Sequence, residues 1–138
     1  NPIGYVTNGV HVPTFLFQRW KDVFDVQYGE EWRTHLSDPA YWARVYELPD
    51  TLFWETRQGI KSSMLKLVRE RLKRQCTRNN VSEAHFQRQA RFLEPENPRV
   101  LTIGFARRFA TYKRATLLFR DPRLLASIVG DPDRPVVF

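Results

Sequence analysis

The stretch from Val100 to Phe119 reads VLTIGFARRFATYKRATLLF and combines an apolar run with a cluster of basic residues. Its first four residues, Val100 to Ile103, are apolar or β-branched and predict a buried strand. From Tyr112 onward the apolar residues follow helical spacing, and the hydroxyl of Thr111 is suited to cap a first helical turn. The stretch therefore predicts a strand, a basic loop and a helix, in that order.

The loop of this unit has an unusual concentration of positive charge. Six lysines or arginines and no acidic residue lie from Arg99 to Arg120. Lys113 and Arg114 fall in the first turn of the expected helix, where the helix dipole disfavours positive charge. This placement favours an anion-binding site, because backbone N–H groups and basic side chains then converge on one ligand. The alternative is a basic surface loop that contacts only solvent.

The bulk properties suit a globular protein, and the two ends of the sequence lead us to expect more chain on either side. The chain has 138 residues, of which 42% are hydrophobic and 14% aromatic, enough to build an ordinary core. It starts at Asn1 without a methionine and stops within a strand-like run, Pro135 to Phe138. A βαβ crossover normally connects two neighbouring strands of a larger parallel sheet whose faces are covered by helices. The two strands expected here are too few to form such a sheet. We therefore expect this chain to be a piece of a larger protein.

The net charge and the cysteine content indicate which class of partner the protein binds and in which cellular compartment it lies. The net charge of +7 favours an anionic partner. The single Cys76 excludes an internal disulfide and agrees with a reducing, cytoplasmic location. No run approaches the roughly 20 apolar residues that span a bilayer, so no membrane partner is expected.

Helical patterns dominate the chain up to residue 93, and a proline-containing linker follows at 94–99. Helices are expected at residues 15–28, 39–48, 51–78, 82–93 and 121–129, a turn at Asn8-Gly9, and a last strand at the C-terminus. The predicted organisation is a helix-rich part, residues 1–95, followed by the start of a parallel α/β domain, residues 96–138.

Other chemical motifs are absent from the sequence. There is no GxGxxG, P-loop or GxSxG, and three histidines with one cysteine have no metal-ligand spacing, so no metal site is expected. The helix at 51–78 is basic, with eight lysines or arginines and one acid from Arg57 to Arg78. RNA, a membrane surface or a calmodulin-like partner would suit such a helix, but a solvated face is its commoner role. Aromatic residues do not interleave with the basic ones, which argues against nucleic acid.

Two segments resemble the α-glucan (glycogen, starch and maltodextrin) phosphorylases, most closely the bacterial and archaeal branch. The run Thr7-Asn8-Gly9-Val10-His11, followed by Phe15-Leu16, resembles the family's TNG segment near the junction of its two lobes. The run GFARRFATYKR, which ends at Arg114, resembles the first strand-loop-helix unit of the C-terminal lobe. His11 departs from the commonest form of the first segment, and no role is assigned to it.

The resemblance implies an α/β enzyme with the GT-B fold, in which two Rossmann-like lobes enclose the active site. Residues 1–95 would then form the helix-rich end of the N-terminal lobe and the interdomain segment, and residues 96–138 the start of the C-terminal lobe. The implied reaction is reversible phosphorolysis of α-1,4-glucan ends, which uses inorganic phosphate and releases glucose 1-phosphate. The implied cofactor is pyridoxal 5′-phosphate. Its Schiff-base lysine would lie beyond this chain, so the chain alone is expected to be inactive.

The resemblance also implies roles for three basic residues. Arg107 would lie towards the cofactor phosphate, and Arg108 and Lys113 towards the substrate phosphate. Relatives often have lysine and arginine where this chain has Arg107 and Arg108. A glycogen or starch synthase-type GT-B glycosyltransferase is the alternative, since those enzymes have an arginine and a lysine five positions apart that meet a nucleotide diphosphate. A basic nucleic-acid-binding module is the third possibility.

Overall fold

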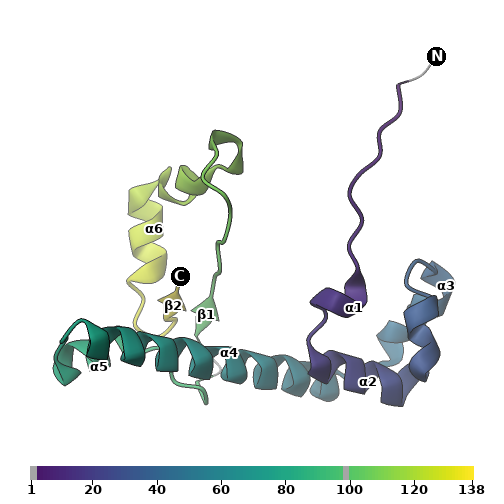
Figure 1. Cartoon of the computed structure of the whole chain (residues 1–138), viewed down its shortest axis with the longest axis horizontal. Helices are drawn as coiled ribbons and strands as arrows, with labels where there is room; N and C mark the ends of the chain where they lie inside the picture. Colours follow the sequence, from purple (N-terminus) through teal and green to yellow (C-terminus); the bar gives the residue numbers. More distant parts are fainter. Residues whose placement is uncertain (1–2, 98–99) are drawn as a thin grey trace. The chain divides into compact units, whose positions relative to one another are not determined.

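The computed structural model describes residues 3–97 and 100–138, and the chain forms two compact units. The first unit is Asn1–Ile60 and the second is Lys61–Phe138, so the division falls inside the long helix α4, Asp50–Arg78 (Figure 1). The expected boundary between residues 95 and 96 concerns the lobes of a larger protein and stays a prediction. Within the expected linker, residues 98 and 99 lie outside the described residues.

The first unit is built from short helices that precede and include the start of α4. They are α1 (Val12–Phe15), α2 (Gln18–Tyr28), the 3₁₀ helix η1 (Glu30–Thr34), α3 (Pro39–Trp42) and the 3₁₀ helix η2 (Ala43–Glu47). Helix α2 ends where Gly29 adopts a φ of 76°, a conformation that glycine tolerates best. At the start of α3, Asp38 Oδ1 accepts the N–H groups of Ala40 and Tyr41 at 2.9 and 3.2 Å. The end of α2 at residue 28 and the start of α3 at residue 39 agree with the helices expected at 15–28 and 39–48.

Aromatic rings form the interior of the first unit. The rings of Phe24 and Trp42 meet nearly edge to face, with centroids 5.3 Å apart, and the Trp32 ring lies 5.6 Å from Phe24. Trp32 is completely buried. Edge-to-face contacts of this kind stabilise a core beyond the area that they bury. Phe24, Trp32 and Trp42 therefore pack in the interior of the first unit, whereas Tyr46 is 90% exposed.

The expected turn at Asn8-Gly9 is not formed. Residues 3–11 adopt no helix, strand or turn, and Gly9 does not take a positive φ. A hairpin turn at an Asn-Gly pair needs a strand on each side that can pair across it. No described strand flanks this pair, so no hairpin can form that would hold the dipeptide in a turn.

The second unit packs helix α5, Glu83–Ala90, beside the C-terminal part of α4. Helix α4 ends at Arg78, and Asn80 follows in the left-handed region with a φ of 51°. Ser82 Oγ then accepts the N–H of His85 and caps α5. The buried cluster contains Leu65, Cys76, Phe86, Ala90 and Leu93. The predicted helix 51–78, the break after it and the start at Ser82 are confirmed.

Arg69 joins α4 to α5 and to the residues that follow it. Its Nη1 donates to the carbonyl of Ala90 at 3.1 Å and to Glu94 Oε1 at 2.7 Å. The guanidinium carbon also lies 5.4 Å from the centre of the Phe86 ring. The start of the expected linker is thus held against α4.

The two strands of the second unit pair in parallel. Strand β1 (Leu101–Thr102) lies beside β2 (Val136–Val137), with Leu101 opposite Val136. Between the strands the chain passes through helix α6, Pro122–Val129, which Asp121 Oδ1 caps by accepting the Arg123 and Leu124 N–H groups. The described chain is helix-rich with a two-stranded parallel sheet, as the β-helix-β pattern predicts.

The helix expected from Tyr112 is not an α-helix. Residues Thr111–Lys113 form the 3₁₀ turn η3 and Ala115–Phe119 form the 3₁₀ helix η4. Between them Arg114 adopts a left-handed conformation with a φ of 52° and a ψ of 42°. A left-handed residue cannot continue a right-handed α-helix, so the helical spacing of the apolar residues is realised as two tight turns. Thr111 makes no capping hydrogen bond, which makes that prediction wrong as well.

Candidate phosphate-binding loop

The candidate site begins where β1 ends. After Ile103, whose N–H donates to the Val137 carbonyl at 2.9 Å, the chain leaves the sheet and runs without regular structure to Ala110. In parallel α/β sheets, ligands bind beyond the carboxyl ends of the strands. The loop from Gly104 to Arg114 therefore lies at the edge of the sheet where such sites form.

The turn at the end of the loop positions Lys113. The Lys113 N–H donates to the Ala110 carbonyl at 2.9 Å, and the Arg114 N–H donates to the Thr111 carbonyl at 3.0 Å. These two bonds close η3 and turn the chain back. The Lys113 ammonium lies 4.5 Å from the centre of the Tyr112 ring, a cation–π distance. Lys113 is half-buried, whereas Arg107 and Arg108 are exposed.

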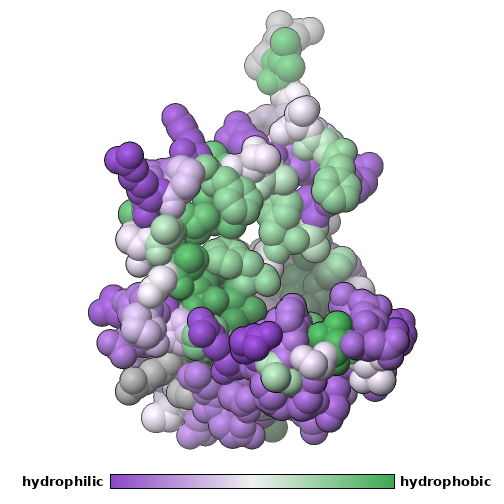
Figure 2. All heavy atoms as spheres, turned by 90° about the vertical axis from the view of Figure 1, so that its left-hand side faces the viewer, coloured by the Kyte–Doolittle hydropathy of each residue, from purple (hydrophilic) through white to green (hydrophobic). Residues whose placement is uncertain are grey.

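A hollow of about 750 Å³ opens beside this turn. Lys113 and Arg114 line its basic side, and apolar side chains that include Phe105, Leu118 and Phe138 line the rest. Figure 2 shows hydrophobic side chains gathered around a hollow on the side of the molecule where α5 and α6 lie. Arg107 and Arg108 do not line the hollow, so of the three predicted site residues only Lys113 reaches it.

The cations of the loop form no ion pair with an acidic side chain of the described residues. Within residues 3–97 and 100–138, the ion pairs are Arg33–Asp25, His35–Asp38 and Arg69–Glu94, and none involves the loop. Unpaired cations of this number repel one another and favour a bound anion. Arginine offers a phosphate a bidentate fork and lysine a compact charge, so these side chains have the chemistry of a candidate phosphate site.

Sequence analysis placed Arg114 beside Lys113 in a basic helical turn but missed that its backbone is left-handed. Its left-handed backbone turns the chain so that its side chain joins Lys113 at the hollow. The left-handed conformation is uncommon for residues other than glycine and asparagine. The amino-acid sequence therefore does not indicate that Arg114 adopts it. The ring of Tyr112 beneath Lys113 was also missed, although the two residues are neighbours in the sequence.

Comparison with known proteins identifies the relatives of this chain. It is 36% identical over 135 residues to the maltodextrin phosphorylase of Thermococcus litoralis and, over the same length, to the glycogen phosphorylase of Mycobacterium tuberculosis. It is 32% identical over 136 residues to the glycogen phosphorylase of Aquifex aeolicus. These matches cover 98–99% of this chain. This chain is homologous to a segment of the α-glucan phosphorylases.

The homology confirms the resemblance found in the two short motifs and extends it to the residues between them. The chain spans only 15–19% of the length of these curated relatives. No family model matches the chain, and no solved structure matches it. The matches give no support to the synthase alternative.

Two further observations concern other kinds of site. Among the helices of the described residues, none has the combination of length and hydrophobicity needed to cross a membrane. The same part of the chain holds no group of three or more histidine, cysteine or acidic side chains that could bind a metal ion.

Proposed function

We propose that this chain is part of a cytoplasmic α-1,4-glucan phosphorylase of the GT-B fold and that its Gly104–Arg114 loop binds phosphate. The observation that carries the proposal is the set of loop cations without acidic partners, on a chain homologous to phosphorylases along nearly its whole length. The reaction moves the terminal glucosyl group of glycogen, starch or maltodextrin to inorganic phosphate and yields glucose 1-phosphate. The boundary between the two lobes would lie near residues 95 and 96.

The loop residues would share two phosphate groups. Arg108 and Lys113 would hold the substrate phosphate, with Arg114 beside Lys113. During transfer of the glucosyl group, negative charge shifts on the substrate phosphate. Cations already positioned at that phosphate stabilise the transition state more than the ground state. The half-buried Lys113 suits this role, because a cation shielded from water interacts more strongly with phosphate.

Arg107 would face the phosphate group of pyridoxal 5′-phosphate. Its guanidinium is exposed and has no acidic partner among the described residues, so it fits a phosphate in charge and in access. When bound, the cofactor supplies its phosphate group beside the substrate phosphate. Arg107 would contribute by binding and orienting that group.

The test uses Arg108→Ala and Lys113→Ala in the full-length protein. Loss of one preorganised electrostatic contact typically lowers the rate by roughly 10²–10³-fold, and we expect that loss in phosphorolysis together with weaker phosphate binding. Glucan binding and thermal stability should change little. Arg123→Ala on α6 is the control, because its side chain is exposed and lies outside the loop.

Two outcomes would overturn the proposal. Loop variants that lose stability but keep their phosphate affinity would show that the loop is only a structural basic segment. Glucosyl transfer from a nucleotide sugar, without phosphate-dependent release of glucose 1-phosphate, would indicate the synthase-type alternative.

A further inference from the structure

The C-terminal part of α4 has two faces with different surroundings. On one face, Leu65 and Cys76 are buried in the core of the second unit, Leu72 packs against that core, and Arg69 bonds to α5 and Glu94. The opposite face carries residues spaced alternately three and four positions apart. This exposed stripe consists of Met64, Leu67, Arg71, Arg74 and Arg78.

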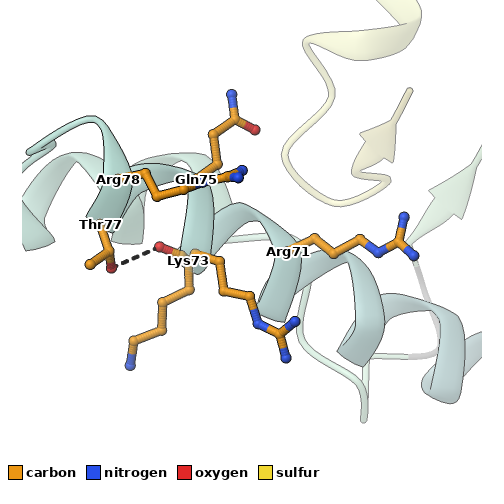
Figure 3. Close-up of a pocket in the computed structure, with 6 residues that line it drawn as sticks. Arg71, Lys73, Gln75, Thr77 and Arg78 are labelled. Carbon is orange, nitrogen blue, oxygen red and sulfur yellow. Dashed lines mark hydrogen bonds between the residues drawn. The ribbon is translucent and has the colours of Figure 1, made fainter.

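The exposed stripe is apolar at one end and basic at the other. Met64 is 39% exposed and Leu67 is 49% exposed, whereas the three arginines follow them towards the end of the helix. Lys73, Gln75 and Thr77 line the same hollow as the arginines, and no acidic side chain of the described residues lines it (Figure 3). Thr77 Oγ1 is already bonded to the Lys73 carbonyl at 3.0 Å.

None of these three arginines makes an ion pair with another described residue. Like charges three and four residues apart, as in Arg71, Arg74 and Arg78, destabilise a helix. The helix dipole favours cations only near the C-terminal turn, and of the three only Arg78 lies in that turn. Arg69 shows the contrast, because it reaches an acidic partner and a carbonyl within the unit.

We propose that the exposed stripe of α4 docks an acidic amphipathic helix of a partner protein. Alternating spacings of three and four residues keep side chains along one seam between two helices, as in coiled coils. Apolar residues of the partner helix would cover Met64 and Leu67, and its carboxylates would pair with Arg71, Arg74 and Arg78, whose forks bind carboxylates bidentately.

This arrangement favours a protein helix over the other anionic partners. A membrane-bound helix places apolar and basic residues on different sides around its axis, whereas here they follow one another along a single stripe. Single-stranded nucleic acid is usually bound on aromatic side chains, and the stripe has none.

The test measures binding of designed peptides to the full-length protein. The first peptide, about 18 residues long, matches the stripe with leucines in one half of its seam and glutamates in the other. The second has the same composition in shuffled order. We expect the first peptide to bind, and Arg71→Glu with Arg74→Glu to weaken its binding at least about tenfold. Met64→Ser with Leu67→Ser should weaken it as well.

The matched control is Lys66→Glu with Arg88→Glu, which changes net charge equally at exposed positions outside the stripe. We expect it to change binding by less than about twofold. Equal binding of the shuffled peptide, equal loss in both double variants, or no binding of the first peptide would overturn the proposal. So would binding of duplex RNA or anionic phospholipid vesicles through Arg71 and Arg74 when the peptide does not bind. Circular dichroism of each variant checks that α4 remains folded.

Discussion

At the scale of single residues, the carboxylate of Asp25 links α2 to the chain that follows it. It accepts hydrogen bonds from Trp32 Nε1 at 2.7 Å and from Arg33 Nη2 at 2.9 Å. The hydrogen bonds from Arg33 and then Trp32 hold the pKa of Asp25 below its ordinary value of 3.8. Because the folded-state pKa is the lower one, this contribution to stability is complete above the ordinary pKa and is lost as the pH falls through the folded-state pKa.

We expect Asp25→Asn to lower the free energy of unfolding at neutral pH, and the difference from the wild type to shrink in acid below the ordinary pKa. Urea unfolding followed by tryptophan fluorescence measures both effects, since Trp32 donates to the same carboxylate. Asp22→Asn is the control, because Asp22 is exposed and, among the described residues, accepts a side-chain hydrogen bond only from Gln18. A difference that stays constant into acid would contradict the pKa argument.

Arg114 offers a second test at this scale, of conformation rather than charge. Its φ of 52° costs energy for a residue with a Cβ and almost none for glycine. We expect Arg114→Gly to be more stable to heat than Arg114→Ala, by up to about 1 kcal/mol at the transition. Both variants lose the same charge and should therefore bind phosphate equally. Equal stability would mean that the loop relaxes into another conformation.

At the scale of elements, the packing of α5 on α4 combines a small apolar cluster with one polar contact. The cluster includes Phe86 and Leu93, and Arg69 lies over the Phe86 ring while it donates to Ala90 and Glu94. Removing the guanidinium leaves a carbonyl and a carboxylate without this donor. The polar contact is thus a defined target for mutation.

We expect Arg69→Ala to destabilise the α4–α5 contact by about 1–3 kcal/mol, the usual cost of leaving a hydrogen-bonding group without its partner. Hydrogen exchange at the amides of α5 should speed up, and Arg69→Lys should restore part of the protection. Arg71→Ala serves as the control, because Arg71 is an exposed residue of the same helix. Unchanged exchange in Arg69→Ala would show that the apolar cluster alone holds α5.

At the scale of the whole molecule, the described chain consists of two compact units with α4 running from one into the other. The loop with Arg107 and Arg108 is exposed and irregular, whereas the basic residues of α4 lie in a continuous helix. A protease needs an extended backbone, so cleavage inside a helix first requires local unfolding.

Limited trypsin digestion of the full-length protein should therefore cut at Arg107 or Arg108 before it cuts within α4. Inorganic phosphate should slow the first cut and leave later cuts unchanged, because a bound anion orders the loop. Control digestions contain sulfate or chloride at the same ionic strength as the phosphate. Comparing them with the phosphate digestion separates specific binding of the anion from general screening of charge. First cleavage inside α4 would contradict the predicted order of stability.

Local chemistry decided most of the helices and their ends. Asp38 before Pro39, Ser82 before Glu83 and Gly29 after Tyr28 act through bonds to their own neighbours, so the sequence alone located these boundaries. The parallel pairing of β1 with β2 also followed from the sequence, since a helix between two apolar runs favours that connection. The resemblance to phosphorylases rested likewise on short local motifs, and homology over the whole chain confirmed it.

Tertiary structure decided what depends on contacts between distant residues or on rare backbone conformations. The left-handed Arg114 replaced the expected helix by two 3₁₀ turns and brought Arg114 to the hollow beside Lys113. The Asn8-Gly9 turn did not form because no strands pair on either side of it. Arg69 differs from the exposed arginines of α4 through its hydrogen bonds to the Ala90 carbonyl and to Glu94, which the sequence does not reveal. Residue type sets which interactions a side chain can make, whereas the three-dimensional arrangement sets which partners are within its reach.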